Sequence, residues 1–223
     1  MALNTTMDTH VVATDTPRWY FDFISPFAWL QWPKIAALAE RRKVELRPLL
    51  FAAVLDRIGQ KGPAEIPGKR EFTYRHVLWQ ARQAGQPLHF PPTHPFNPLA
   101  ALRLCLAASD RIKATAAIFD WIWAQGRAGD SIDALAPVAA QLGIADPAAA
   151  IAAPEVKAAL RANYEAAIAD QVFGVPTLVV HGQPFWGNDA TGFALAVLDD
   201  PTLLDDPEMR RVDTLPASAS RVP

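Results

Sequence analysis

The stretch FDFISPFAWL, residues 21–30, holds the end of one predicted element and the start of the next. Its first half belongs to the aromatic run RWYFDF (18–23), whose short length and aromatic content predict a strand. Its second half opens the segment 25–42, in which apolar residues recur with helical spacing. Ser25 is a favoured N-cap residue, and Pro26 is favoured at the first helical position. The sequence therefore predicts a strand that passes directly into a helix at Ser25.

Working outward, VELRPLL (44–50) reads as a second strand. Two strands joined by one helix of this length form a right-handed parallel unit. Near the other end of the chain, VPTLVV (175–180) predicts a buried strand, followed by the turn HGQ and the short partner strand PFW. A helix is predicted over 188–200, with Asn188 or Asp189 as its N-cap.

The middle of the chain has a different character. A loop rich in Gly, Pro and Lys (59–70) precedes a helix at 70–84 and a proline-dense loop at 87–98. Residues 99–170 are alanine-rich and helical, with breaks near the glycines and Pro154. The resulting order, βαβ, then helices, then a ββ hairpin and a helix, predicts an α/β thioredoxin fold with an inserted all-helical domain.

The expected domain limits follow from this order. The thioredoxin-like domain is split between 17–52 and 171–203, and 53–170 forms the insertion. Residues 1–16 and 204–223 are expected to be flexible tails.

Composition narrows the class of protein. The chain has 223 residues, a formal net charge of −2 and 51% hydrophobic residues, so we expect neither nucleic acid nor an anionic membrane surface as a partner. No apolar run reaches the ~18 residues of a membrane span, and the first residues lack the pattern of a secretory signal. The single cysteine, Cys105, cannot form an internal disulfide, and a cytoplasmic location is expected. Cys105 lies in an apolar helical run and is expected to be a small buried hydrophobe.

Two long motifs resemble a known family. YFDFISPFAWL near the start and VFGVPTLVVHGQPFWGNDA near the end are similar to the 2-hydroxychromene-2-carboxylate isomerases. These belong with the kappa-class glutathione transferases and are relatives of the periplasmic disulfide oxidoreductases. The resemblance spans about residues 18–200, and it is looser in the middle.

In the redox relatives the helix start carries Cys-x-x-Cys, whereas this chain has Ser25-Pro26-Phe27-Ala28. Thiol–disulfide exchange by this motif is therefore excluded. The helix N-terminus still favours an anion such as a thiolate, and a serine hydroxyl can donate to a sulfur supplied from outside. The resemblance implies that the outside thiol is glutathione.

The second motif is expected to complete the glutathione site. In the thioredoxin fold the Val175–Pro176 bond is expected to be cis, which leaves the backbone of Val175 free to pair with the peptide as an added strand. Trp186 and Gly187 would shape the wall and allow close approach. The amides around Asn188 suit the γ-glutamyl carboxylate, and Asp189 suits the ammonium group.

The family reaction implies a small aromatic carboxylate substrate and a cis–trans isomerisation by reversible thiolate addition, bond rotation and elimination. Lys61 and Lys69 could meet the substrate carboxylate, and Asn97 could donate to a developing enolate or phenol oxygen. Trp121 and Trp123 fall on different helix faces, so we expect one to pack in the core and the other to face a groove or a partner. Family relatives are dimers, and we expect a homodimer to which the inserted helices with Trp121 and Trp123 offer apolar surface.

Simpler interpretations stay open at each position. Ser25 and Asn97 are also natural helix caps, Asp189 is itself a cap candidate, and the two lysines could be solvated loop charges. His89 and His94 share a loop without a cysteine or carboxylate pattern, so no metal site is predicted. The competing functions are a kappa-like glutathione transferase acting on another electrophile and a non-catalytic thioredoxin-fold protein that binds peptides or thiols.

Overall fold

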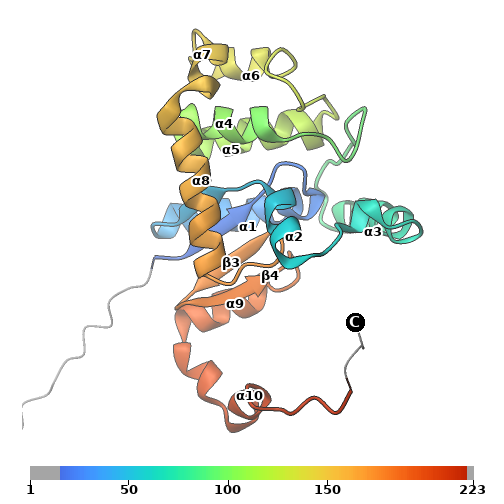
Figure 1. Ribbon diagram of the computed structural model, residues 1–223, viewed down its shortest axis with the longest axis vertical. Helices are drawn as coiled ribbons and strands as arrows, with labels where there is room; N and C mark the ends of the chain where they lie inside the picture. Colours follow the sequence, from blue (N-terminus) through green and yellow to red (C-terminus); the bar gives the residue numbers. More distant parts are fainter. Residues whose placement is uncertain (1–15, 220–223) are drawn as a thin grey trace, which may run out of the picture.

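The computed structural model describes residues 16–219 and is built around a mixed four-stranded sheet with the order β2-β1-β3-β4 (Figure 1). β1 (Arg18–Phe21) runs parallel to β2 (Glu45–Pro48) and antiparallel to β3 (Thr177–Val180). β4 (Gln183–Trp186) pairs antiparallel with β3. The two central strands thus come from opposite ends of the chain. This arrangement confirms the predicted α/β thioredoxin fold with a helical insertion.

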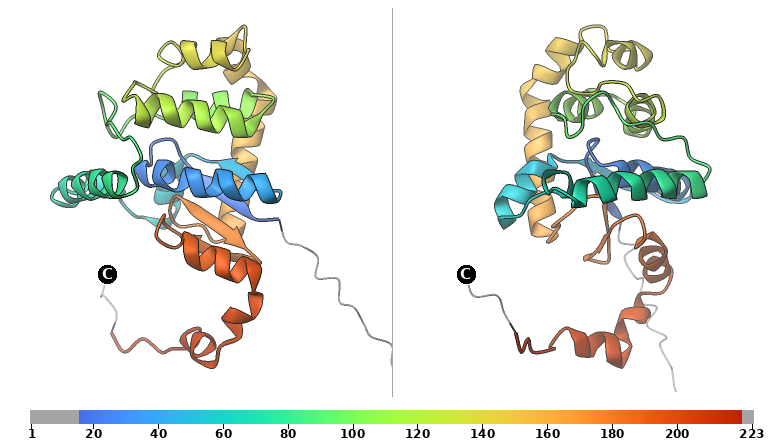
Figure 2. Two further views of the ribbon diagram at one scale, coloured as in Figure 1. Left: turned by 180° about the vertical axis from the view of Figure 1, so that it is seen from behind. Right: turned by 90° about the vertical axis from the view of Figure 1, so that its right-hand side faces the viewer.

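Helices pack against both faces of the sheet: α1 (Pro26–Arg41), α2 (Phe51–Ile58), α8 (Pro154–Ala169) and α9 (Thr191–Asp199). Strand residues alternate between the two faces. Trp19 and Phe21 lie in the cluster that includes α1 and α9, whereas Tyr20 lies in the cluster that includes α2 and α8. Figure 2 shows α1 and α9 on one side of the sheet, with α8 on the other. The near-continuous apolar character of β1 therefore follows from burial on both faces.

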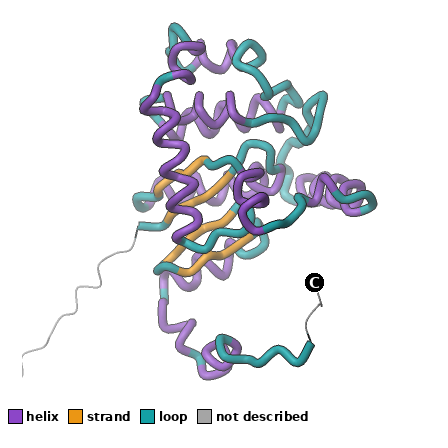
Figure 3. The backbone as a smooth tube through the Cα atoms, viewed as in Figure 1, coloured by secondary structure: helices purple, strands orange, loops and turns teal. Residues whose placement is uncertain are grey.

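The inserted segment between β2 and β3 consists of helices joined by loops (Figure 3). Besides α2 and α8 it contains η1 (Pro63–Glu65), α3 (Lys69–Gln83), α4 (Leu99–Ala107), α5 (Arg111–Phe119), the π-helical turn η2 (Asp120–Ala124), α6 (Ala136–Gln141) and α7 (Pro147–Ala152). After α9 the chain continues as η3 (Pro201–Asp205) and α10 (Pro207–Val212). Among the described residues, no helix has both the length and the apolar character needed to span a membrane.

The insertion shares its core with α1. The ring of Phe119 lies 4.7 Å from that of Phe23, 6.2 Å from Trp19 and 6.4 Å from Trp32. Trp123 is fully buried in the same cluster, and Trp121 packs partly buried against it. Trp123 is therefore the one of the two tryptophans that packs in the core, and it offers no surface to a partner. Because α1 is held between the sheet and the inserted helices, its first turn is fixed from both sides.

Two details concern the ends of elements. α9 begins at Thr191 with Ala190 at the N-cap position and no side-chain cap, so the expectation of an Asn188 or Asp189 cap was wrong. The side-chain oxygen of Asn188 instead accepts from Lys34, 2.9 Å away. Of the predicted tails, residues 1–15 and 220–223 lie outside the described residues, and α10 lies within the predicted C-terminal tail. The predicted domain limits stay a prediction.

Candidate functional site

The site is centred on Ser25, which occupies the N-cap of α1 as the sequence predicts. Its hydroxyl oxygen accepts from the backbone N–H of Ala28 at 3.3 Å. Because the hydroxyl acts there as an acceptor, its own proton stays available for donation. Ser25 is 7% exposed, so a ligand that reaches the hydroxyl meets the helix N-terminus in partly dehydrated surroundings. Pro26 leaves one fewer helix-start N–H to satisfy.

Strand register brings the second motif to the end of the central strands where Ser25 lies. Tyr20 in β1 lies opposite Thr177 in β3, and the two strands are antiparallel. The residues that follow β1 and lead to Ser25 therefore run beside the residues that precede β3, namely Val175 and Pro176. Thus two motifs far apart in the sequence meet at one end of the central strand pair.

The Val175–Pro176 peptide bond is cis, as predicted. Among the hydrogen bonds of residues 16–219, none involves the backbone N–H or C=O of Val175. The neighbouring Pro176 carbonyl is in use, since it accepts from the backbone N–H of Gly187 at 2.8 Å. The Val175 groups therefore remain able to pair with an added peptide strand.

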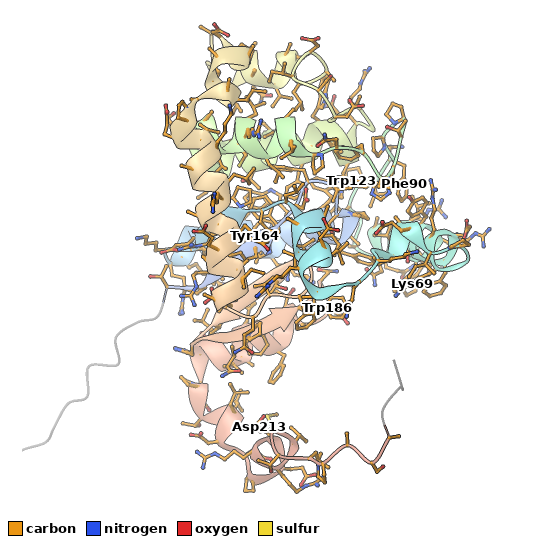
Figure 4. The ribbon with its side chains drawn as sticks, in the orientation of Figure 1. Lys69, Phe90, Trp123, Tyr164, Trp186 and Asp213 are labelled. Carbon is orange, nitrogen blue, oxygen red and sulfur yellow. The ribbon has the colours of Figure 1, made fainter. Side chains whose placement is uncertain are left out.

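Gly187 has a positive φ of 99°, a conformation that favours glycine. A side chain there would also collide with the carboxylate oxygen of Asp189, which lies directly over it. Gly174 is restricted in a similar way, because a Cβ atom on it would meet the indole nitrogen of Trp186. The indole therefore rests on the backbone just before the cis-proline bond, with 54% of Trp186 exposed. Figure 4 shows Trp186 at the end of β4, near α2.

A buried glutamine ties this segment to α1. The side-chain N–H₂ of Gln31 donates to the Gly187 carbonyl at 3.2 Å and to the Thr191 hydroxyl at 2.8 Å. Its oxygen accepts from the indole N–H of Trp19 at 2.6 Å. Because Gln31 is fully buried and uses both ends of its amide, it fixes the distance between the Ser25 helix and the Gly187 turn.

The remaining predicted glutathione contacts lie around this turn. The side chain of Asn188 is held by Lys34 on α1, and its carbonyl also accepts from the Lys34 ammonium at 3.3 Å. Asp189 is exposed. The Lys34 ammonium therefore lies beside the turn, and the exposed Asp189 carboxylate lies on it. These charges complement the carboxylate and the ammonium group of an amino acid.

Within residues 16–219, no hydrogen bond links the three predicted substrate residues to Ser25 or to the Gly187 turn. Lys61 lies in the loop before η1 and Lys69 is the first residue of α3, labelled in Figure 4. Both are exposed, and neither side chain forms a hydrogen bond or ion pair with the described residues. Asn97 is exposed, and its side-chain oxygen accepts from the backbone N–H of Leu99 at 3.1 Å at the start of α4. The N-cap position of α4 is Pro98, without a side-chain cap, so Asn97 is not the N-cap residue although its side chain accepts from the first N–H of the helix. Substrate contact by these three residues stays a prediction.

Asp22 is a fully buried carboxylate that sequence reasoning missed. One oxygen accepts from the N–H of Ile24 at 3.1 Å, and the other accepts from the N–H of Phe51, the first residue of α2, at 2.9 Å. Burial raises the pKa of Asp22 to about 7, although the backbone donors act in the opposite direction. A polar residue between two aromatic residues in the predicted strand 18–23 was the available signal, since a buried charge requires partners.

Other titratable groups lie near the site or in the core. Burial lowers the pKa of His94, whose ring contacts the Ile24 carbonyl. Cys105 is buried as predicted, and burial raises the pKa of its thiol to about 11. Within residues 16–219 no group of three or more histidine, cysteine or acidic side chains is arranged to hold a metal ion.

Comparison with known proteins gives a consistent result. A family model for DSBA-like thioredoxin domains matches residues 18–198. The chain is 29% identical over 194 residues to a 2-hydroxychromene-2-carboxylate isomerase from Sphingobium xenophagum, covering 84% of this chain and 100% of that protein. It is 30% identical over 177 residues to the enzyme of that name from Pseudomonas putida, covering 76% and 87% respectively.

Solved structures share the fold. A 2-hydroxychromene-2-carboxylate isomerase superposes with a TM-score of 0.74 at 23% identity, covering 87% of this chain and 99% of that one. The cytosolic disulfide reductase DsbM from Pseudomonas aeruginosa, in a structure with GSH, gives a TM-score of 0.56 at 19% identity, covering 88% and 100%. From the family model and the sequence relatives together, the chain belongs to the DSBA-like thioredoxin domain family and, within it, to the 2-hydroxychromene-2-carboxylate isomerases.

Proposed function

We propose that the protein is a glutathione-dependent isomerase of a 2-hydroxychromene-2-carboxylate-type intermediate in aromatic ring degradation. The observation that carries the proposal is the Ser25 helix start, where a hydroxyl proton is available beside the unpaired backbone of Val175. A serine in place of a redox cysteine suits a site that holds an external thiolate without forming a disulfide with it.

The residues present fit glutathione as the thiol. Val175 has a free backbone N–H and C=O for the peptide, and Asp189 offers an exposed carboxylate for the ammonium group. Lys34 lies at the Asn188 side of the turn, where its charge suits the γ-glutamyl carboxylate. When bound, glutathione supplies a thiolate that adds reversibly to the conjugated substrate and thereby permits rotation about a former double bond.

The chain's own residues bind, orient and stabilise charge. Ser25 donates its proton toward the sulfur, and the first N–H groups of α1 lower the free energy of the thiolate. Trp186 forms an apolar wall. Lys61 and Lys69 attract the substrate carboxylate, and the amide N–H₂ of Asn97 stays free to donate to an oxygen that gains charge.

We also propose a homodimer. Trp123 is buried, so the apolar surface must come from elsewhere. Phe72 and Trp79 on α3 are 65% and 57% exposed, and their rings stack on either side of His76. A stable dimer would bury at least about 1,000 Å² in total. Light scattering at micromolar concentration measures the mass, and a monomer there would remove this part of the proposal.

The test is an absorbance assay with a chromene carboxylate, run with and without glutathione, together with calorimetric titration of glutathione. We expect turnover that requires glutathione. Binding without isomerisation, but with conjugation of another electrophile, would favour the transferase alternative. No binding at millimolar glutathione would contradict the proposal and favour the non-catalytic alternative.

A further inference from the structure

The four residues from Asp22 to Ser25 form a loop whose backbone is held by side chains from distant segments. The Ser25 N–H donates to the Asp22 carbonyl at 3.0 Å. The Phe23 carbonyl accepts from the indole N–H of Trp123 at 2.8 Å. The Ile24 carbonyl lies 2.8 Å from Nε2 of His94. The two carbonyls that precede Ser25 are therefore both held by ring nitrogens of the inserted segment.

The contacts of His94 determine which of its nitrogens carries the proton. A carbonyl oxygen can only accept, so Nε2 must carry the hydrogen that faces Ile24. Nδ1 is then an acceptor, and the Tyr74 hydroxyl lies 2.6 Å from it and 3.0 Å from the His94 backbone carbonyl, so its single proton is shared between these two acceptors. Arg70 donates to the backbone carbonyl of His94 at 2.8 Å. Tyr74 and Arg70 both belong to α3, so this helix holds the ring and the backbone of His94 in place, while the Ile24 carbonyl selects the tautomer.

The surroundings of the ring favour a single orientation. It meets Phe90, Phe96 and Trp123 edge-on, with centroid distances of 5.7, 6.2 and 5.5 Å. Phe90 and Trp123 lie close together in Figure 4, where the inserted helices meet the sheet half of the molecule. Burial lowers the pKa of His94, which agrees with a neutral ring that has one donor and one acceptor.

We propose that His94, oriented by Tyr74, is a positioning residue that fixes the Ile24 carbonyl and thereby the direction of the Ser25 hydroxyl and the first N–H groups of α1. The role in catalysis rests on the proposed thiol function of Ser25. Through Tyr74, the same contact joins α3 to the loop that carries Ser25. A shift of α3 is therefore transmitted to the thiol site.

The first experiment compares Tyr74→Phe with Tyr164→Phe. Tyr164 lies on α8 and its hydroxyl has no hydrogen bond within residues 16–219, so it is a matched control for loss of one hydroxyl. Without the Tyr74 hydroxyl, Nδ1 has no donor, and the ring loses one of the two hydrogen bonds that hold its orientation. We expect kcat to fall about threefold to tenfold, with the glutathione Kd changed less than about twofold.

Substitutions of His94 give the rescue test. Gln places an amide N–H near the position of Nε2, whereas Leu has no donor. We expect His94→Leu to raise the pKa of bound glutathione, which is measured from the thiolate absorbance across pH. His94→Gln should restore part of the wild-type value. A residue that only fills space would show no such difference between Gln and Leu.

A second readout does not depend on glutathione. Ser25→Cys places a thiol directly at the helix start, and its alkylation rate across pH gives its pKa. Native Cys105 adds little background because it is buried with a raised pKa. Adding Tyr74→Phe or His94→Leu is expected to slow alkylation at neutral pH about threefold or more. Circular dichroism confirms that each variant is folded, and Tyr74→Phe alone decides if His94→Leu fails to fold.

The outcomes separate the two proposals. The positioning role would be overturned if Tyr74→Phe or His94→Leu, each combined with Ser25→Cys and folded, had an alkylation rate within about twofold of Ser25→Cys combined with the control Tyr164→Phe. If the wild-type protein binds no glutathione while the introduced thiol still responds to His94 and Tyr74, the proposed function fails and the positioning of the helix start stands.

Discussion

Replacement of Asp22 by asparagine is expected to make the stability of the protein less dependent on pH. Asp22 is fully buried, and burial raises its pKa from the ordinary value near 3.8 to about 7. In the unfolded chain the same carboxyl titrates near its ordinary value. Asparagine has nearly the same shape as the protonated acid and carries no charge. The variant therefore resembles the protein with Asp22 held neutral.

The sign follows from proton binding. Below about pH 4 both the folded and the unfolded chain carry the proton, and Asp22 contributes no pH dependence. Between about pH 4 and pH 7 the unfolded chain has lost the proton and the folded chain keeps it, so the free energy of unfolding falls as pH rises. Above pH 7 both states are ionised and the loss is complete. A shift from 3.8 to about 7 corresponds to a total on the order of 4 kcal/mol.

Urea unfolding of wild type and Asp22→Asn from pH 4.5 to pH 8.5 measures this effect. We expect the free-energy difference between the two to move in favour of the variant as pH rises. Asp56→Asn is the matched control, because Asp56 is exposed on α2, the helix whose first N–H Asp22 accepts. If instead the variant becomes relatively less stable toward high pH, the two backbone donors outweigh burial and the reasoning about Asp22 is refuted.

Three further predictions follow from the site. Ser25→Ala removes one charge-assisted hydrogen bond, worth about 1.5–3 kcal/mol, so turnover with glutathione should fall roughly tenfold to a hundredfold while the helix N–H groups preserve much of the binding; an unchanged rate and thiol pKa would reduce Ser25 to a helix cap. Gln31→Leu leaves the Trp19 indole without its acceptor and frees the Gly187 turn, so the free energy of unfolding should fall by about 2–4 kcal/mol and glutathione should bind more weakly. A variant as stable as wild type would contradict the role given to Gln31. The protein should not reduce insulin disulfides, and activity that survives Cys105→Ala would show that another redox group is present.

The fold could be predicted because its decisive signals are local. The helix cap at Ser25, the apolar strands and the proline before β3 each act within a few residues, and each has a specific physical cause. The fold then follows from the order of the elements. The length of β1 was overestimated, because the chain leaves the ladder at Asp22, whose carbonyl accepts from the Ser25 N–H in the turn that leads into α1.

The contacts that hold the site were not predictable in the same way. Gln31, His94 and Trp123 act on residues far from them in the sequence, and a single sequence contains no signal that pairs such positions. Trp123 illustrates the difficulty. Its place in a helical segment gave no indication that its indole N–H would meet the Phe23 carbonyl, so the sequence did not decide which of the two tryptophans would be buried.

The position of the two central strands also determines when the site can exist during synthesis. β1 and β2 emerge from the ribosome early, together with Ser25, but β3 emerges only after the whole insertion. Pairing between such distant segments forms late, because the intervening chain must first be ordered. A nascent chain that ends before β3 lacks Val175, the Gly187 turn and the partner strand beside β1. The arrangement of Ser25 beside Val175 therefore exists only once the chain has been made through the Gly187 turn.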